Sequence, residues 1–240
     1  MQGPIESATA VILAGGLGTR LRPVLADRPK ILASVGGRPF LACLFDQLAA
    51  AGLREVVLCV GYRGQQVEAA FGTSYQPLRL TYSFEDTPLG TGGALRQALH
   101  LMKSDPVLVL NGDSFCEADL RSLWDFHAAR EAIATLLLTH VPDTRRYGRV
   151  HGDDDGQVQA FEEKGDHGGP GCISGGVYVL SRRVIAEIPD QGPVSLEREV
   201  FPSWIGRGLY GCLSEGRFLD IGTPASYAAA DNFFATQAAP

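Results

Sequence analysis

The chain has 240 residues, of which 45% are hydrophobic and 20% are charged, the ordinary balance of a globular protein that can bury a large core. Its formal net charge of -6 leaves no excess of Lys and Arg to neutralise a phosphate backbone, which argues against a general nucleic-acid binder. No apolar run approaches the roughly 18 to 20 residues that span a bilayer, and residues 1–10 lack the pattern of a secretory signal, so we expect a cytoplasmic protein without membrane insertion.

Strand-length apolar runs alternate with segments of helical period in the first part of the chain. In chain order they predict strand 8–14, helix 40–51, strand 55–60, helix 65–71, strand 78–83, helix 91–102, strand 107–110, helix 120–130 and strand 133–140. This alternation is typical of a parallel sheet with covering helices. It favours a Rossmann-like, nucleotide-binding half over about residues 8–140.

The pattern changes after Pro142. Strands 149–151 and 158–161 flank the acidic stretch 152–156, which predicts a hairpin whose aspartates form a solvated turn rather than a metal site. The remaining expected elements are strand 176–180, helical segments 184–188 and 196–205, strands 210–213 and 218–221, and a closing helix 224–235. We therefore expect one α/β domain over residues 1–240, with a mixed, mainly parallel sheet covered by helices.

The first expected strand runs into a glycine-rich loop, G-G-L-G-T-R, at residues 15–20. Glycines let backbone N–H groups approach an anion closely, and the Arg20 guanidinium can place two hydrogen bonds on phosphate oxygens. Lys30 follows at a distance that a loop can fold back across. The loop lacks the third glycine of a dinucleotide fingerprint and the G-K-[ST] ending of a P-loop. It predicts a phosphate cradle, with a plain tight turn and a surface lysine as the alternatives.

Two further segments point to a ligand at the same edge of the sheet. The run L-G-T-G-G-A at 89–94 opens a helix, where its backbone could lie against a nucleobase, or it is a helix start with small residues. Asp113, in N-G-D after strand 107–110, stands at the carboxyl edge of a parallel sheet, where ligands of open α/β folds bind. With Asp220 it could hold Mg²⁺ beside triphosphate oxygens, or each Asp is a turn or cap residue.

In this order, six segments resemble the nucleoside-diphosphate-sugar pyrophosphorylases, also called sugar-1-phosphate nucleotidyltransferases. They are G-G-x-G-T-R-L-x-P from residue 15, P-K at 29–30, L-G-T-G-G-A at 89–94, N-G-D at 111–113, E-K at 163–164 and D-I-G-T-P at 220–224. They cover the chain from Val11 to about Phe234. The resemblance implies a magnesium-dependent enzyme in which a sugar 1-phosphate attacks the α-phosphorus of a nucleoside triphosphate and releases pyrophosphate.

The resemblance also implies roles for individual residues. Arg20, Lys30 and Asp113 would be catalytic, and Asp113 and Asp220 would bind Mg²⁺. The residues expected at the nucleotide are Leu13, Ala14, Gly15, Gly16, Gly18, Thr19, Gly90, Thr91 and Gly92. The residues expected at the sugar phosphate, in a sugar-binding half over about 141–240, are Gly148, Glu163, Lys164 and Ser174.

Within the family, the short chain and phrases such as S-F-E-D-T-P-L-G-T-G-G-A at 83–94 are most similar to the guanylyltransferases of D-glycero-α-D-manno-heptose 1-phosphate. That likeness implies GTP as substrate and GDP-heptose for surface polysaccharides as product. Ser174, where relatives often have Asn, and Ile31, where they usually have a second proline, depart from the pattern. Mannose-1-phosphate guanylyltransferases and other sugar-1-phosphate nucleotidyltransferases are therefore alternatives.

Two hypotheses lie outside these enzymes. A non-catalytic sugar-nucleotide sensor would be expected to lose the phosphate cations or metal carboxylates, which are all present here. An NAD-dependent oxidoreductase requires the G-x-G-x-x-G loop that is broken in this chain. Because the family is often dimeric, a homodimer is a further expectation.

Overall fold

The computed structural model describes residues 2–21, 24–25, 27–162, 164–165 and 168–235. The strands of its large sheet are β1 (Thr9–Ala14), β4 (Glu55–Val60), β5 (Ser74–Tyr75), β6 (Leu78–Phe84), β7 (Val107–Asn111), β9 (Ala134–Val141), β10 (Arg149–Gly152), β11 (Val158–Glu162), β12 (Gly171–Leu180) and β13 (Leu209–Ser214). Two small sheets pair β2 (Ser34–Val35) with β3 (Arg38–Pro39), and β8 (Ser114–Cys116) with β14 (Phe218–Asp220).

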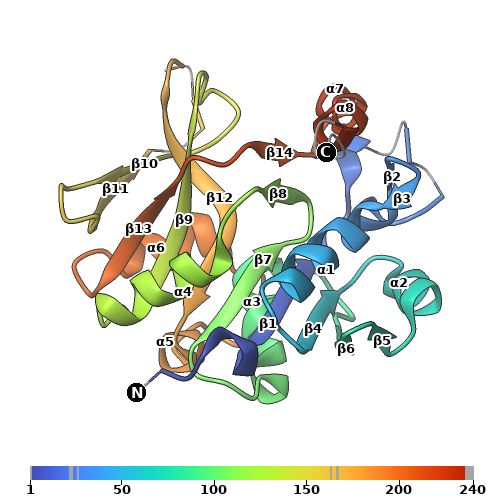
Figure 1. The fold of residues 1–240 in the computed structure, drawn as a ribbon, viewed down its shortest axis with the longest axis horizontal. Coiled ribbons are helices and arrows are strands. Elements are labelled where there is room, and N and C mark those ends of the chain that lie inside the picture. The colour runs from blue at the N-terminus through green and yellow to red at the C-terminus, as the bar shows by residue number, and fades with distance from the viewer. Residues whose placement is uncertain (1, 22–23, 26, 163, 166–167, 236–240) are drawn as a thin grey trace.

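Helices cover both faces of the large sheet (Figure 1). The α-helices are α1 (Phe40–Ala50), α2 (Gly64–Phe71), α3 (Gly90–Gln97), α4 (Leu120–Ala129), α5 (Arg182–Ala186), α6 (Phe201–Ser203), α7 (Pro224–Ala228) and α8 (Ala230–Ala235). Short 3-10 helices are found at Ile5–Ser7, Thr19–Leu21, Lys30–Leu32 and Ala98–Leu101, and a π-helical turn at Leu196–Val200. Figure 1 shows α1 and α4 in front of the sheet and α3 behind it.

The sheet is mixed, and its parallel part is the half that the sequence predicted to bind a nucleotide. Its order is β11-β10-β12-β7-β1-β4-β6-β5, with β9 beside β12 and β13 beside β9. The neighbours β7, β1, β4 and β6 are parallel, and Ile12 lies opposite both Leu58 and Leu110. Beyond β7, the next strand is β12, which is antiparallel to β7 and also to its other two partners, β9 and β10. The predicted α/β sheet with covering helices is confirmed.

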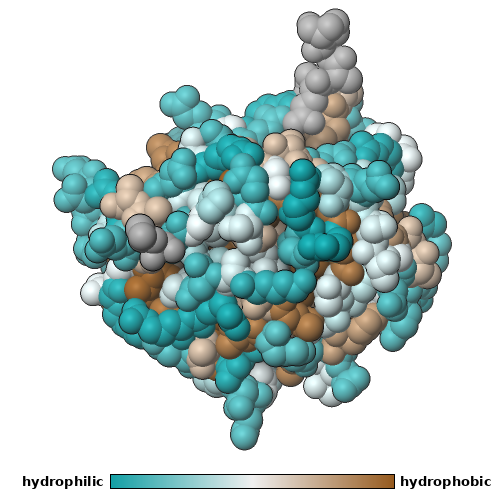
Figure 2. Space-filling view, turned by 60° about the horizontal axis from the view of Figure 1, so that its bottom comes forward, coloured by the Kyte–Doolittle hydropathy of each residue, from teal (hydrophilic) through white to brown (hydrophobic). Residues whose placement is uncertain are grey.

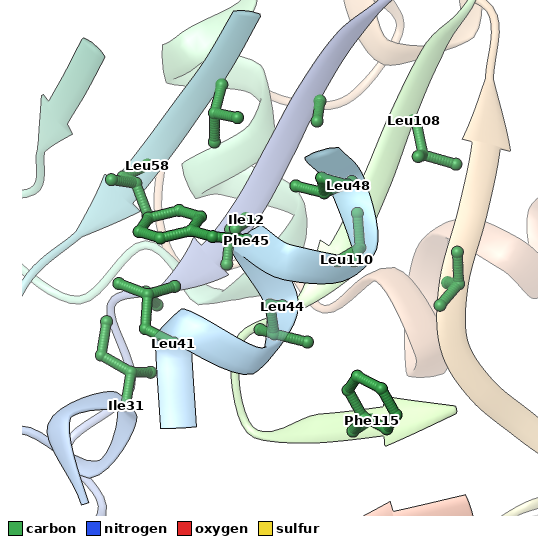
Figure 3. Close-up of a cluster of buried hydrophobic side chains, with 14 of the residues drawn as sticks. Ile12, Ile31, Leu41, Leu44, Phe45, Leu48, Leu58, Leu108, Leu110 and Phe115 are labelled. Carbon is green, nitrogen blue, oxygen red and sulfur yellow. The ribbon is translucent and has the colours of Figure 1, made fainter. Parts of the chain in front are cut away.

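The central strands are buried on both faces, which explains their continuous apolar runs. Along β1, Ile12 belongs to the cluster under α1, whereas Val11 and Leu13 belong to the cluster on the α3 side. Figure 3 shows the strand residues of the first cluster beneath Phe45 and its neighbours on α1. Burying one such side chain contributes on the order of 1.5 to 3 kcal/mol, so this packing anchors the strand ends that carry the loops.

Several element boundaries differ from those expected. Strand β12 begins at Gly171 rather than residue 176, because a register shift between Ser174 and Tyr178 and a positive φ of 74° at Gly176 let it bend and continue. The expected closing helix is divided at Ala229 into α7 and α8. The segment expected as one helix over 196–205 consists of the π-helical turn followed by α6.

The predicted acidic hairpin is present. Strands β10 and β11 pair antiparallel, and the Asp153 carboxylate accepts hydrogen bonds from the backbone N–H groups of Asp155 and Gln157 at 3.1 and 2.8 Å. The side chain therefore closes the turn from within, as Asp commonly does.

Hydrophilic residues predominate on the face drawn in Figure 2, and the hydrophobic residues visible there lie in smaller areas among them. Among the described residues, the exposed large hydrophobic side chains are Leu17, Val24, Phe84 and Leu213. No helix in the described ranges has the length and apolarity needed to cross a bilayer.

Candidate active site

A cavity of about 680 Å³ opens at the carboxyl ends of the parallel strands. Its walls come from the loop after β1, the turn after β7, the start of α3 and the second half of the chain. Of the residues singled out from the sequence, those that line it are Leu13, Ala14, Gly15, Gly16, Gly18, Thr19, Arg20, Lys30, Gly90, Thr91, Asp113, Gly148, Lys164, Ser174 and Asp220. One hollow thus collects segments from both ends of the sequence, as ligand sites in open α/β sheets do.

Two of the expected site residues are not placed there. Gly92 is buried against the segment before the π-helical turn: its N–H donates to Val194 O at 2.8 Å, and a β-carbon would lie 3.1 Å from Val194 Cγ1. Gly92 therefore does not line the cavity, and its lack of a side chain serves packing between α3 and that segment. Its contact with the nucleotide stays a prediction. Glu163 lies outside the described residues.

The glycine loop has the shape of a cradle. A β-carbon at Gly15 would collide with the Glu85 carboxylate, and Gly18 has a positive φ of 58° that a residue without a side chain adopts easily. The loop then tightens into the 3-10 turn at Thr19–Leu21, where Leu21 N–H donates to Gly18 O at 2.9 Å. Arg20 is exposed at the cavity. Backbone and guanidinium donors therefore stand along one wall.

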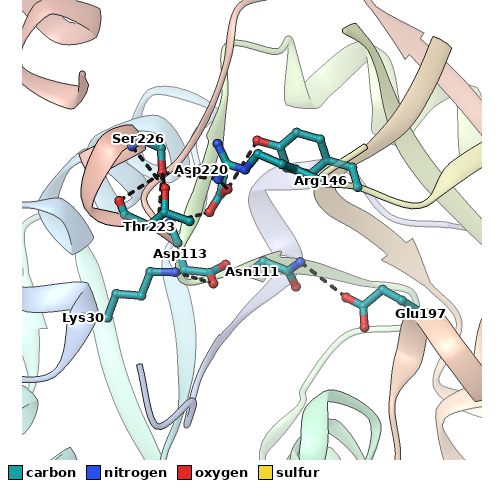
Figure 4. Close-up of polar contacts among 10 residues, drawn as sticks. Lys30, Asn111, Asp113, Arg146, Glu197, Asp220, Thr223 and Ser226 are labelled. Atoms are coloured by element: carbon teal, nitrogen blue, oxygen red, sulfur yellow. Dashed lines mark hydrogen bonds and ion pairs between the residues drawn. The ribbon is translucent and has the colours of Figure 1, made fainter. Parts of the chain in front are cut away.

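The two carboxylates that the sequence proposed as metal ligands are brought to one side of the cavity. Asp113 follows β7, and Asp220 ends β14, where it pairs with Ser114 of β8. The N–H of Ile221 donates to the Asp113 carbonyl oxygen at 3.0 Å, which ties the two segments together next to both carboxylates. Lys30 Nζ lies 2.8 Å from Asp113 Oδ2 (Figure 4).

Asp220 has its own set of partners. Arg146 Nη2 lies 2.7 Å from Asp220 Oδ2, and the Tyr147 hydroxyl donates to the same oxygen at 3.3 Å. The backbone N–H of Gly222 donates to Oδ1, and a β-carbon at Gly222 would collide with that oxygen. Burial, followed by the Asp220 charge, raises the pKa of Tyr147 to about 12, so the phenol remains a hydrogen-bond donor at neutral pH.

A divalent cation fits the donor set without an all-protein cage. In the part of the chain that the structure describes, no group of three or more His, Cys, Asp or Glu side chains could hold a metal ion. Two carboxylates at a cavity still suit a hard cation such as Mg²⁺, which keeps waters and takes substrate phosphate oxygens for its other positions. The site is therefore one that a phosphate ligand would complete.

A polar network at the cavity was not predicted from the sequence. Glu197, in the π-helical turn, accepts from the Thr91 hydroxyl at 3.1 Å and from the Tyr178 hydroxyl at 3.3 Å. Asn111 Nδ2 donates to the Tyr178 oxygen at 3.1 Å, and Ser174 Oγ lies 3.3 Å from it. Burial, followed by the Glu197 charge, raises the pKa of Tyr178. Glu197 lies in S-L-E at residues 195–197, a phrase that matches no catalytic or ligand-binding motif by itself.

Two buried polar atoms beside this network lack protein partners. Within the described ranges, neither Asn111 Oδ1 nor Ser114 Oγ makes a hydrogen bond. Both line the cavity, and a β-carbon at Gly176 would collide with Ser114 Oγ and lie 3.2 Å from Asn111 Cβ. Because an unsatisfied buried polar atom costs about 1 to 3 kcal/mol, the pair favours a polar ligand in the space in front of them.

Glu85 is a further cavity residue that sequence reasoning passed over. It is half-buried between the glycine loop and the start of α3, and burial raises the pKa of its carboxyl. Its Oε2 accepts from the N–H of Leu89 at 3.0 Å, which lowers that pKa and points the group along the helix start. From this place the carboxylate could accept hydrogen bonds from a ligand bound next to Gly90 and Thr91.

Comparison with known proteins agrees with this geometry. Residues 9–237 match the family model described as nucleotidyl transferase. The chain belongs to the nucleotidyl transferase family. The match includes the glycine loop, both carboxylates and the network around Glu197, so the membership predicted from six motifs is confirmed.

Individual relatives of this nucleotidyl transferase are guanylyltransferases. It is 40% identical over 222 residues to a mannose-1-phosphate guanylyltransferase of Mycobacterium tuberculosis. This alignment covers 91% of the chain described here and 62% of the length of the relative. It is 36% identical over 219 residues to a D-glycero-alpha-D-manno-heptose 1-phosphate guanylyltransferase of Aneurinibacillus thermoaerophilus, covering 91% of this chain and 94% of the relative. The crystal structure of HddC from Yersinia pseudotuberculosis complexed with GMP-PN matches with a TM-score of 0.82 at 31% identity, over 95% of this chain and 99% of that one.

Proposed function

We propose that this nucleotidyl transferase moves GMP from GTP to a sugar 1-phosphate and releases pyrophosphate. The observation that carries the proposal is the arrangement of Lys30, Asp113 and Asp220 at one cavity with the glycine loop of residues 15–20. A reaction between two phosphate compounds requires several cations and backbone donors around one point, and this wall supplies them. The guanylyltransferase relatives support the choice of reaction.

In the proposed reaction the triphosphate lies along the glycine loop. Backbone N–H groups of residues 15–20 and the Arg20 guanidinium hold phosphate oxygens, and the Lys30 ammonium neutralises charge on the transferred group. A phosphate oxygen of the sugar 1-phosphate attacks the α-phosphorus, forming the new P–O bond, while the bond from that phosphorus to the pyrophosphate oxygen breaks. The nucleophile and leaving group are both competent, so positioning and charge neutralisation would supply most of the rate.

The two carboxylates are proposed as ligands of a divalent cation, with Mg²⁺ as the physiological ion. Asp113 and Asp220 would each contribute oxygen, and the hydrogen bonds of Asp220 to Tyr147 and Gly222 would keep its carboxylate oriented. The ion, when bound, neutralises charge on the phosphate oxygens. This division of roles is supported by the donor set, which lacks the third protein ligand of a structural metal site in the described residues.

Glu85 is proposed as the residue that favours guanine. Guanine presents two adjacent donors, N1–H and the N2 amine, to a single carboxylate, whereas adenine, cytosine, uracil and thymine offer no such pair on one edge. With the triphosphate along the loop, the base would reach the start of α3, where Gly90, Thr91 and Glu85 line the cavity. The complex of HddC with GMP-PN supports a guanine nucleotide in this family.

The sugar is proposed to lie over the second half of the chain, within a single domain in which residues of about 141–240 bind it. Gly148 would meet the sugar through its backbone N–H, Lys164 would pair with its phosphate, and Ser174 would contact a hydroxyl. The free acceptor of Asn111 and the hydroxyl of Ser114 offer further hydrogen bonds. We propose D-glycero-α-D-manno-heptose 1-phosphate, because the heptose relative matches over 94% of its length; mannose 1-phosphate is the second candidate, supported by the relative at 40% identity.

The experiment is pyrophosphate release by the whole chain with GTP, dTTP, UTP, CTP and ATP, each crossed with the 1-phosphates of manno-heptose, mannose and glucose. Each pair is run with Mg²⁺ and with EDTA. Release that requires Mg²⁺ and is fastest with GTP and the heptose supports the full proposal. Fastest release with another pair keeps the reaction and corrects the substrate, whereas absence of both release and nucleotide binding overturns the proposal.

A further inference from the structure

Arg146 is a cavity residue that the reaction proposed above leaves without a role. Its Nη2 lies 2.7 Å from Asp220 Oδ2 and 3.5 Å from Ser226 Oγ. Its guanidinium carbon lies 5.4 Å from the centre of the Tyr147 ring, so the group also stacks on its chain neighbour. Figure 4 shows it reaching across the cavity wall to Asp220. A cation therefore sits on one of the two carboxylates assigned to the metal.

The partners of Asp220 are of two kinds. The N–H of Gly222 and the hydroxyl of Tyr147 belong to groups whose positions are set by the backbone and by burial. Arg146 instead reaches Asp220 with a long side chain that is 45% exposed, whereas the carboxylate is 17% exposed. Arg146 can consequently leave while the carboxylate keeps its orientation.

The second carboxylate also has a cation as its partner, but there the lysine is the buried group, with the Lys30 side chain 11% exposed and the Asp113 side chain 48% exposed. Lys30 pairs with Asp113 as Arg146 pairs with Asp220, so each negative charge has one positive partner. A divalent cation on these carboxylates would leave both side-chain cations without their partners. The triphosphate and the sugar phosphate bring the negative charges that would receive them.

The position of Arg146 indicates which phosphate it would meet. It immediately precedes Tyr147 and Gly148, and it lines the cavity together with Lys164. Gly148 is the residue proposed to meet the sugar, and Lys164 is the residue proposed to pair with its phosphate. A guanidinium can place two parallel hydrogen bonds on phosphate oxygens, which an ammonium cannot do.

We propose that Arg146 exchanges between Asp220 and the phosphate of the sugar 1-phosphate. It occupies the metal carboxylate in the free enzyme, competes there with the divalent cation, and turns to the sugar phosphate when both have bound. This inference rests on the proposed function, since it takes Asp220 as a metal ligand and a sugar phosphate as substrate. It makes Arg146 a phosphate-binding residue and couples metal entry to substrate entry.

The first test measures Mn²⁺ binding to the whole chain without any nucleotide, from the electron paramagnetic resonance signal of free Mn²⁺. Arg146→Gln removes the competing cation and is expected to tighten Mn²⁺ binding about two- to fivefold, the range typical of a partly exposed ion pair. Arg146→Lys keeps a charge on Asp220 and should bind Mn²⁺ nearly as weakly as the unaltered chain. Arg145→Gln is the matched control, because Arg145 pairs with Asp143 instead.

The second test asks whether Arg146 binds the phosphate of the sugar 1-phosphate, independently of its effect on the metal. With the sugar 1-phosphate that is turned over fastest, Arg146→Gln should raise KM for the sugar 1-phosphate about tenfold or more and change KM for GTP much less. An unchanged KM for the sugar 1-phosphate overturns the transfer of Arg146 to that phosphate. An Mn²⁺ affinity in Arg146→Gln equal to that of the unaltered chain overturns the competition at Asp220.

Asp220→Asn distinguishes failure of this inference from failure of the metal assignment. If Asp220→Asn weakens Mn²⁺ binding while Arg146→Gln leaves it unchanged, the carboxylate is a ligand and the exchange alone is wrong. If Asp220→Asn also leaves Mn²⁺ binding unchanged, the metal assignment of the proposed function fails and the exchange fails with it. Thermal unfolding of every variant confirms that the compared proteins are folded.

Discussion

The ammonium of Lys30 lies 2.8 Å from Oδ2 of Asp113, and this ion pair joins the turn after the glycine loop to the end of β7. The Lys30 side chain is 11% exposed, so its charge depends on the carboxylate for compensation. The same carboxylate points into the cavity and is the one proposed to bind the divalent cation. The Asp113 carboxylate therefore has both a structural partner and a proposed chemical role.

Replacing Asp113 by Asn should abolish most of the activity. The amide keeps the shape but loses the charge that would hold the metal and compensate Lys30. Loss of one well-placed charged contact costs roughly 2.7 to 4 kcal/mol in transition-state stabilisation, so pyrophosphate release should fall about a hundredfold or more. Asp190→Asn removes an exposed carboxylate outside the cavity and should leave the rate within a factor of about two. Comparable rates for the two variants would remove Asp113 from the reaction.

Gly222→Ala tests whether the orientation of Asp220 matters. The added β-carbon would collide with Asp220 Oδ1, so the carboxylate must turn away from the Gly222 N–H that holds it. Since a misplaced group near the chemistry can cost about a hundredfold, we expect turnover to fall at least about tenfold while the chain stays folded. Gly152→Ala is the control, because its new β-carbon would have Gln157 O as nearest neighbour at 3.4 Å, an ordinary van der Waals distance. Steady-state pyrophosphate release of the two variants decides the point; equal rates would mean that Asp220 tolerates reorientation.

The sequence predicted the parts of the site that depend on local chemistry. Apolar runs bounded by turn residues are enough to predict β1, β4 and β7, and a glycine loop with Arg20 after the first of them predicts a phosphate-binding wall. The carboxyl ends of parallel strands meet at one edge of a sheet, which is why the position of Asp113 after β7 was enough to predict that it lies beside that loop. Asp220, at the end of a short strand before a helix, offered the second carboxylate, and the family resemblance then supported both as metal ligands.

The remaining features depend on contacts between distant segments. Nothing near Glu197 in the sequence indicates that its carboxylate will reach Tyr178 and Thr91, because the π-helical turn and the bend of β12 at Gly176 create that meeting. Gly92 is a second example of a position that distant contacts decide. Its place in a glycine-rich run suggested contact with a ligand, whereas tertiary packing places it against Val194.

Glu85→Gln should weaken the preference for guanine. A carboxylate can accept hydrogen bonds from both the N1–H and the N2 amine of guanine. A Gln side chain can accept only one of them, because its own NH2 group would face the other guanine donor. Hydrogen bonds to charged groups contribute roughly 1.5 to 3 kcal/mol, so kcat/KM for GTP should fall about tenfold or more. Inosine triphosphate (ITP) lacks the N2 amine, so its kcat/KM should fall less than that of GTP. The ratio of kcat/KM for GTP to kcat/KM for ITP should therefore be lower in Glu85→Gln than in the unaltered chain.

Asp86→Asn is the matched control for this measurement. Asp86 is the next residue in the chain, is exposed and does not line the cavity. Its GTP-to-ITP ratio should equal that of the unaltered chain. If Glu85→Gln does not change the GTP-to-ITP ratio, guanine must be recognised by other groups, such as the backbone at residues 90–91.

His127 should make the stability of the fold depend on pH. The imidazole is 3% exposed between α4 and β9, and its Nδ1 lies 2.9 Å from Thr135 Oγ1. Burial lowers its pKa from 6.5 to about 4, against a smaller opposite effect of the Asp105 charge. Between pH 6.5 and pH 4 the unfolded chain therefore binds more protons at this residue than the folded chain, so the free energy of unfolding falls as the pH is lowered through that window.

The full contribution of this histidine is on the order of 3 kcal/mol, lost progressively on acidification from pH 6.5 to about pH 4. Urea unfolding at pH 7, 6, 5 and 4.5 measures it as the difference in pH slope between the unaltered chain and His127→Gln, which removes the titrating group and leaves the carboxylates. The slope of His127→Gln should be shallower, whereas His100→Gln, at an exposed site, should retain the original slope. Equal slopes for all three proteins would mean that the buried imidazole gains its proton without opposing the fold, and acid sensitivity would then have to arise from the carboxylates alone.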